Sequence, residues 1–265
     1  MDRVINIKPF EEITSINLND CISESPLKGF KLPRGIIQKK EDIFGLDNWD
    51  TDHWELILNN RIISINHNFG YAMFYYYKGI PDDEWFISPG KEGQSVEFFP
   101  HFDDHHTSSH YNFKYFVDIF FLKAYTVYET IGHLLYKLYD FEINEDDPRD
   151  QVSFKSAIFK LKSKNHRLYR DLNKVKYSDN FKKGVDMRND IAHNHPPYDI
   201  DSGVTKSQGI ITMGVGNYTT SKEIKETMIS FLRSIKATFE VLERACQEKC
   251  VSYSRYFFTR SFRWS

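Results

Sequence analysis

Residues 113–138 read FKYFVDIFFLKAYTVYETIGHLLYKL, and apolar side chains recur in this stretch at every third or fourth position. An α-helix turns once every 3.6 residues or so, about the same interval, so these side chains would share one helix face. The stretch therefore predicts a long helix whose apolar face packs into a core. The face comprises Phe113, Phe116, Phe120, Ala124, Val127, Ile131, Leu134 and Leu138.

The same spacing recurs in two further long stretches and in two short ones. These run from Trp54 to Tyr76, Val152 to Leu161, Phe181 to Ile191 and Ile224 to Cys246. Just before the last of them, Thr220 and Glu223 match a capping box, which satisfies free backbone amides at the start of a helix. Together the patterns predict an all-α fold, a bundle of long helices joined by shorter ones.

Two interruptions of the helical pattern are typical of β-hairpins. Residues 84–88 and 95–99 are rich in aromatic and branched side chains and flank a segment with Pro89, Gly90 and Gly93. Residues 203–219 hold four glycines around a short apolar run. Glycine and proline favour turns between short strands, so each segment predicts a small hairpin.

These patterns divide the chain into four expected parts. Residues 1–50 contain several helix breakers and predict an irregular N-terminal extension that wraps the domain. Residues 51–110 predict a long helix, a β-hairpin and a His-rich loop packed on the core, and residues 111–250 predict the bundle. Residues 251–265 form a tail of aromatic and basic residues, which either packs across the domain or dimer, the commoner case, or stacks RNA bases.

Residues 188–193 read Arg-Asn-Asp-Ile-Ala-His and are followed closely by Pro196 and Pro197. A proline ring clashes with a helical conformation of the preceding residue, so the helix must end near this point. His193 is therefore expected in the last helical turn. Arginine, an amide and histidine gathered at a helix end are suited to binding and reacting with phosphate esters.

An arginine followed by a polar residue and, a few positions later, by histidine resembles the R-x4-6-H signature of HEPN ribonucleases. The order of the predicted helices over residues 111–250 is similar to that of the HEPN bundle, and Arg188 to His193 fall where the family has its motif. The resemblance implies an HEPN-like up-and-down helical bundle with one or two small β-hairpin insertions. It also implies a homodimer whose two motifs meet in one cleft.

The resemblance further implies a metal-independent endoribonuclease, without a cofactor, that cleaves RNA by 2′-hydroxyl attack at this composite dimer site. His193 would transfer protons, Arg188 would stabilise the charge on the phosphate, and Asn189 would orient a side chain or the phosphate. The residues expected to bind the substrate are His195, Lys182, Lys183 and Arg170. Toxin activity and phage defence are typical settings of the family, and a protein inhibitor is a possible partner; no DNA is expected.

Two physical observations favour a dimeric enzyme that acts on RNA, independently of the resemblance. Arg188 and His193 lie five positions apart, so an ideal helix separates them by about 140° and about 7.5 Å. One motif supplies one imidazole, whereas RNA transesterification profits from a base and an acid, which a two-fold dimer would provide. From Lys155 to Arg188 the chain has eleven Lys and Arg against three Asp, a charge that would attract RNA.

Each of these features also has an ordinary explanation. Arg188 can pair with an acidic side chain on a neighbouring helix, His193 and His195 can cap a helix C-terminus, and the basic stretch can be a solvated helix face. The alternative function is a non-catalytic HEPN-like module that binds nucleotides or RNA or serves regulatory dimerisation.

A second cluster precedes the long helix of residues 113–138. Imidazoles and carboxylates this dense can bind a divalent transition metal, although the expected polar loop offers no rigid scaffold and several residues there are ordinary helix-entry residues. No metal site is therefore expected, and the candidates are His101, Asp103, His105, His106 and His110.

Composition is compatible with one sizeable domain: 265 residues, 40% hydrophobic and 27% charged, with a formal net charge of −2. Without an apolar run long enough for a membrane helix or signal core, the sequence predicts a cytoplasmic protein with no membrane contact. The three cysteines fit a reducing compartment. Cys246 and Cys250 lie one helical turn apart and could share a metal, but a core thiol is the commoner role.

Overall fold

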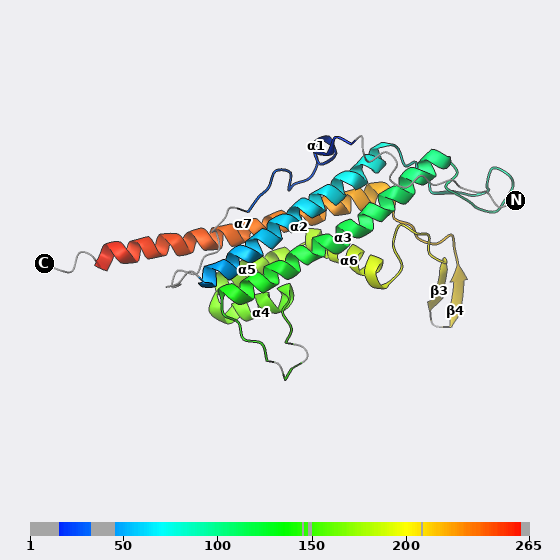
Figure 1. Ribbon diagram of the computed structural model, residues 1–265. Coiled ribbons are helices and arrows are strands. Elements are labelled where there is room, and N and C mark those ends of the chain that lie inside the picture. Colours follow the sequence, from blue (N-terminus) through cyan, green and yellow to red (C-terminus); the bar gives the residue numbers. More distant parts are fainter. Residues whose placement is uncertain (1–15, 33–45, 145, 148–149, 208, 261–265) are drawn as a thin grey trace. The chain divides into compact units, whose positions relative to one another are not determined.

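A computed structural model describes residues 16–32, 46–144, 146–147, 150–207 and 209–260 of the chain. Within these residues it contains seven helices and two small sheets of two strands each (Figure 1), as the sequence predicts for an all-α fold with hairpin insertions. The helices are α1 (Leu18–Cys21), α2 (Leu46–Tyr77), α3 (Asp104–Leu138), α4 (Phe154–Lys164), α5 (His166–Lys176), α6 (Asp179–His193) and α7 (Ser221–Arg260).

Both sheets are antiparallel hairpins at the predicted places. Strands β1 (Phe86–Ile87) and β2 (Glu97–Phe98) pair Phe86 with Phe98. Strands β3 (Val204–Ser207) and β4 (Ile210–Met213) pair Val204 with Met213, and all of their side chains are exposed.

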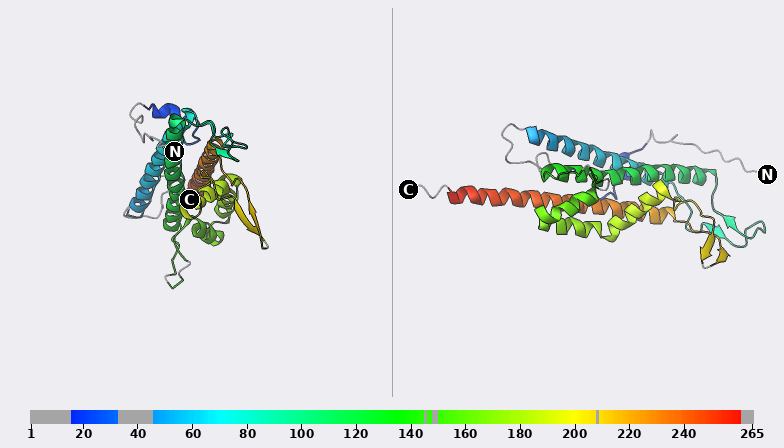
Figure 2. Two further views of the ribbon diagram at one scale, coloured as in Figure 1. Left: turned by 90° about the vertical axis from the view of Figure 1, so that its right-hand side faces the viewer. Right: turned by 90° about the horizontal axis from the view of Figure 1, so that it is seen from below.

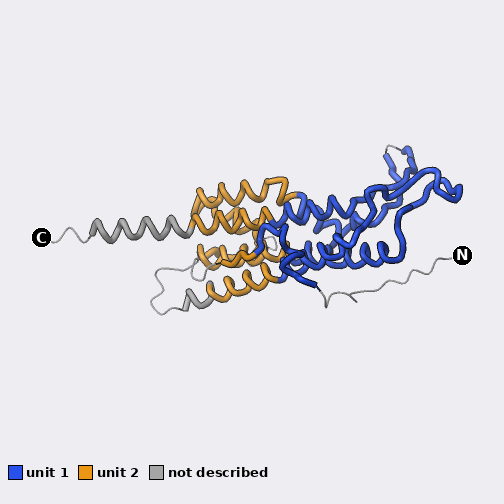
Figure 3. Tube along the Cα trace, turned by 90° about the horizontal axis from the view of Figure 1, so that it is seen from above, with its two compact units in different colours: residues 1–28, 64–123, 183–232 blue, residues 29–63, 124–182, 233–265 orange. Residues whose placement is uncertain are grey.

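The chain folds into two compact units, each assembled from three separate segments (Figure 3). Unit 1 contains residues 1–28, 64–123 and 183–232, and unit 2 contains residues 29–63, 124–182 and 233–265. Helices α2, α3, α6 and α7 contribute residues to both units. The boundaries of the units therefore differ from those of the four parts expected from the sequence. The reason is that one long helix can contribute side chains to the cores of both units.

The core of unit 1 is built from aromatic side chains on α2, α3 and α7. Phe69 and Phe120 lie 6.2 Å apart and Phe121 and Phe231 lie 6.1 Å apart between ring centroids, and all four are fully buried. These rings belong to the apolar faces predicted from the sequence or directly adjoin them. The high phenylalanine content of the chain thus serves helix packing.

Gly184 lets α6 approach α7 within unit 1. A Cβ atom built on Gly184 would lie 2.2 Å from the ring of Phe231, far inside van der Waals contact. Glycine within a helix costs about 1 kcal/mol relative to alanine, so its presence here is explained by the close approach. Together with the buried side chain of Met187, this contact fixes the helix that carries residues 188–193.

In unit 2, Tyr128 of α3 is fully buried against α4 and the start of α6. Its ring lies 5.0 Å from that of Phe154 and 4.9 Å from that of Phe181, and its hydroxyl is 2.6 Å from Ser234 Oγ. Burial raises the pKa of Tyr128, which keeps the phenol neutral. Helices α4 and α5 pack against each other beside this core (Figure 2).

Several boundaries differ from those expected. Helix α2 begins at Leu46, within the part expected to be irregular, and α3 begins at Asp104, so His105 and His106 are helical instead of lying in a loop. Helix α5 was not predicted, because it buries only Leu168 and Leu172. The side chains of Cys246, Cys250 and residues 251–265 lie outside the described residues.

None of the helices, as far as the described residues define them, combines the length and the apolar character needed to cross a membrane.

Candidate active site

Residues 188–193 form the last turns of α6, as predicted. The helix ends at His193, and the amide of Asn194 still donates to the carbonyl of Asp190 at 3.0 Å. The side chains of the same two residues are also hydrogen-bonded, Asn194 Nδ2 to Asp190 Oδ1 at 3.0 Å. These two hydrogen bonds between Asp190 and Asn194 hold the end of the helix in a defined geometry just before Pro196.

The side chains of Arg188, Asn189 and His193 meet at this helix end. Nη1 of Arg188 donates to Oδ1 of Asn189 at 3.0 Å and lies 3.2 Å from Nε2 of His193. Backbone positions that an ideal helix separates by more than a third of a turn are thus joined by the length of the arginine side chain. Arg188 and Asn189 are half-buried, and His193 is exposed to solvent.

The contact between Arg188 and His193 assigns a role to one nitrogen of the imidazole. A guanidinium carries only hydrogen-bond donors, so Nε2 of His193 accepts in this contact with its lone pair. If a phosphate attracts Arg188 away, the lone pair on Nε2 is released to act as a base.

The bundle and this helix end correspond to a known family. A family model described as Cthe2314-like HEPN matches residues 54–243, which is more than half of the chain. The chain belongs to the HEPN family. No match was found among curated proteins or among solved structures.

The HEPN match begins in α2 and ends in α7, so it includes Arg188 to His193. The match starts at residue 54, whereas the sequence pattern predicts that the bundle starts at residue 111, so the match includes one more long helix, α2. The reason is structural, since α2 contributes Phe69 and its neighbours to the core. The HEPN part of this chain thus includes the first hairpin and the His-rich segment.

The residues expected to bind substrate are all exposed. Lys182 and Lys183 lie on α6, ahead of the HEPN motif, and His195 follows the end of that helix. Arg170 lies on α5 and contacts its neighbour Asp171, with Nε 3.3 Å from Oδ1.

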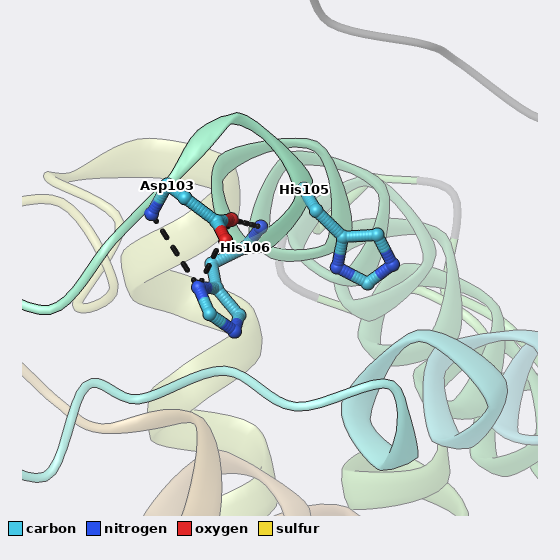
Figure 4. A group of neighbouring side chains, drawn as sticks. All are labelled: Asp103, His105 and His106. Carbon is cyan, nitrogen blue, oxygen red and sulfur yellow. Dashed lines mark hydrogen bonds and ion pairs between the residues drawn. The ribbon is translucent and has the colours of Figure 1, made fainter.

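The His-rich segment contains one group with metal-ligand chemistry. Asp103, His105 and His106 offer ligand atoms that all lie within 4.8 Å of one another. Asp103 also has a structural role, since its Oδ1 accepts from the amide of His106 at 2.7 Å at the start of α3 and lies 3.0 Å from Nδ1 of that ring (Figure 4). The rings of His105 and His106 lie 5.9 Å apart between centroids and are perpendicular to each other (Figure 4).

The other two histidine candidates for a metal site lie apart from this group. His101 pairs through Nε2 with Glu84 at 2.7 Å. His110 is buried and its Nε2 is 3.1 Å from the hydroxyl of Tyr218. The five metal candidates therefore do not form one site.

A buried polar network in unit 1 was not found from the sequence. Asp82 is 1% exposed and accepts hydrogen bonds from the hydroxyl of Tyr218 at 2.6 Å and from the amide and hydroxyl of Ser221 at 2.7 and 2.8 Å. This network links His110 to the start of α7 through Tyr218. Asp82 lies in a loop next to the exposed Asp83, and nothing in the local pattern separates the two.

Proposed function

We propose that this chain is a metal-independent endoribonuclease of the HEPN type that acts as a homodimer. The observation that supports the proposal most directly is the contact between the guanidinium of Arg188 and the solvent-exposed imidazole of His193. HEPN domains are often ribonucleases that dimerise and bind RNA. The motif of this chain keeps both residue types on which such chemistry depends.

In the proposed reaction, Nε2 of His193 takes the proton from a ribose 2′-hydroxyl, and the 2′-oxygen then bonds to the adjacent phosphorus. The bond from phosphorus to the 5′-oxygen breaks, and His193 of the second subunit or a water protonates the departing oxygen. The products are a 2′,3′-cyclic phosphate and a 5′-hydroxyl. The reaction consumes no water and no cofactor.

Arg188 has two roles in this proposal. Its planar guanidinium stabilises the negative charge that develops on the non-bridging oxygens of the phosphate. The compact ammonium of a lysine would do this less well. When it moves to the phosphate, it also frees the lone pair of His193. Asn189 holds the guanidinium until then, through the bond from Nη1 to Oδ1.

The surface charge of α4, α5 and α6 supports RNA as the substrate. Basic side chains outnumber acidic ones from Lys155 to Arg188, and most of them are exposed. Exposed cations provide the sequence-independent part of nucleic-acid affinity, which weakens as salt is added. The exposed basic residues are Lys155, Lys162, Lys164, Arg167, Arg170, Lys174, Lys182 and Lys183.

The proposal is tested by incubating the full chain with mixed RNA in the presence of EDTA and analysing the product ends. We expect cyclic-phosphate ends from the wild type and none from His193→Ala or Arg188→Ala. Arg188→Lys should reduce the rate by about 100-fold, the usual loss when a transition-state donor is misplaced. Cleavage with the wild-type rate in either alanine variant would exclude the proposed roles.

Matched controls separate these roles from general effects of losing a histidine or an arginine. His67 is an exposed histidine on α2 and Arg233 is an exposed arginine on α7, and neither belongs to the proposed site. His67→Ala and Arg233→Lys should cleave like the wild type. Tight RNA binding without any cleavage would instead identify the chain as a non-catalytic HEPN module.

A further inference from the structure

Unit 1 contains a pocket of about 350 Å³ that the proposed reaction does not use. Its walls are mainly aromatic. They are formed by Phe98 of β2, by Phe99 and Phe102 in the segment that follows β2, by His110 of α3 and by Tyr198 in the segment that follows α6. Flat apolar walls suit a flat ligand, and the volume falls in the usual range for small-molecule sites.

Two charged side chains place a donor next to an acceptor in the lining of this pocket. Nζ of Lys114 lies 2.8 Å from Oδ1 of Asp199, and both side chains remain partly exposed. The ammonium has further donors and the carboxylate has a second oxygen, so each can bind a ligand without breaking the pair. A ligand with an acceptor beside donors on one edge would match this arrangement.

The inner wall of the pocket is held by the buried polar network. His110 is only 7% exposed, and its Nε2 contacts Tyr218, whose hydroxyl donates to Asp82. The rings of Phe99 and Phe102 lie 5.7 and 5.5 Å from that of His110. Rings fixed in this way lose little entropy when a ligand stacks on them, which favours binding.

Phe99 adopts a strained backbone conformation within this wall. Its φ is 51°, a left-handed value that non-glycine residues seldom adopt. Its amide nevertheless donates to the carbonyl of Trp85 at 2.7 Å and its ring packs 5.4 Å from that of Tyr218. Strain of this kind concentrates at ligand sites, where the surrounding structure maintains it.

We infer that this pocket binds an unpaired nucleobase, with guanine as the best match. Guanine presents an acceptor, O6, beside two donors, N1–H and N2–H. Lys114 can donate to O6 while the carboxylate of Asp199 accepts from the two donors, and the base stacks on the phenylalanine rings. Pairing of this type discriminates between bases, and stacking adds affinity for any base.

The identity of the ligand as an RNA base rests on the proposed function. Tyr198 follows His193 by five residues, so the two Cα atoms are at most about 18 Å apart. A base held beside Tyr198 and Asp199 would therefore fix the register of an RNA strand relative to His193. The enzyme would then cleave at a defined position relative to a guanine.

Binding is measured by ligand-detected NMR on the full-length His193→Ala protein, so that no cleavage interferes. The probes are guanosine, adenosine, cytidine and uridine, which lack phosphate and do not report on the basic surface. We expect the strongest binding for guanosine. Binding of no nucleoside at millimolar concentration, or equal binding of all four, would overturn the guanine assignment, and the first result would overturn the pocket as a base site.

Two further variants locate the binding. Asp199→Asn should weaken the binding of guanosine by about tenfold or more and leave the binding of uridine nearly unchanged. The substitution replaces one of the two acceptor oxygens by a donor amide, which cannot pair with a second donor of guanine. Phe98→Ala should weaken the binding of all four nucleosides. Tyr111→Ala is the matched control, since Tyr111 is an aromatic residue 45% exposed on α3 outside the pocket and Phe98 is 46% exposed.

If guanosine binds to Asp199→Asn and to Phe98→Ala as tightly as to the protein without these substitutions, the inference is wrong. Should Phe98→Ala fail to fold, Asp199→Asn still decides, because it preserves size and lies at the partly exposed rim. The two proposals fail separately. Guanosine binding without RNA cleavage would retain the pocket and reject the ribonuclease, whereas cleavage without nucleoside binding would do the reverse.

Discussion

Two histidines of unit 1 differ in their surroundings. His193 is exposed and its Nε2 lies 3.2 Å from the guanidinium of Arg188, which can only donate. His110 is neutral because it is buried. The first arrangement suits proton transfer, and the second suits a fixed wall.

The buried histidine makes stability depend on pH. Burial lowers the pKa of His110 to about 3, the positive charge of Lys114 acts in the same direction, and the carboxylate of Asp199 opposes them. In the unfolded chain the pKa of histidine is about 6.5, so only the unfolded state takes up this proton as the pH falls below that value. His110 therefore costs stability progressively between about pH 6.5 and about pH 3, by up to about 1.4 kcal/mol per pH unit.

We expect His110→Gln to flatten this dependence, since glutamine keeps a polar group but does not titrate. Urea unfolding of both proteins at about pH 7 and about pH 5 measures the effect. The wild type should lose more free energy of unfolding than the variant over this interval. An equal loss would mean that other groups account for the acid sensitivity of the protein.

At the scale of elements, the position of α6 depends on its fit against α7. The helix ends where Arg188, Asn189 and His193 meet, so any shift of its axis moves all three side chains. Gly184 and the buried Met187 are the contacts that locate it in unit 1. A change at Gly184 therefore tests how the bundle positions the proposed site.

Gly184→Ala should destabilise the protein although alanine favours helices. The gain in helix propensity is about 1 kcal/mol, whereas forcing a methyl group against the ring of Phe231 costs about 1–3 kcal/mol, so the clash wins or at best balances the gain. Denaturant unfolding measures the difference. Asp186→Ala, an exposed position on the same helix, should change stability by less than about 0.5 kcal/mol, and a stabilised Gly184→Ala would contradict the close approach.

At the scale of the whole molecule, the proposed chemistry benefits from a second copy of the chain. One chain carries one Arg188 and one His193, whereas the reaction benefits from a base and an acid. A two-fold interface supplies both from the same surface patch. Activity is therefore expected to follow the fraction of dimer as protein is diluted.

Mixing two inactive variants distinguishes a shared cleft from independent sites. In a heterodimer of Arg188→Ala and His193→Ala, one chain supplies His193 and the other supplies Arg188. If the motifs share a cleft, the mixture should recover part of the cleavage activity in EDTA that neither variant has alone. No recovery, together with an active protein that sediments as a monomer, would contradict the dimeric site.

Much of the fold follows from local pattern. Apolar spacing predicts α3 and most of α2 and α7, because each of these helices buries one face over the residues whose burial is described. Thr220 and Glu223 form the predicted capping contacts, with Thr220 N donating to Glu223 Oε2 at 2.9 Å and Glu223 N donating to Thr220 Oγ1 at 3.3 Å. Helix α5 escapes prediction because its short polar sequence takes its stability from packing on α4.

The amino-acid sequence by itself determined the helical class of the protein and the end of α6 at His193, since periodicity and proline sterics act between near neighbours. Only the tertiary structure decided which polar side chains meet. The contact of Arg188 with His193 depends on a rotamer, and the burial of His110 and Asp82 depends on residues more than a hundred positions away. The network of Asp82, His110 and Tyr218 arises from the packing of distant segments, which no local pattern contains.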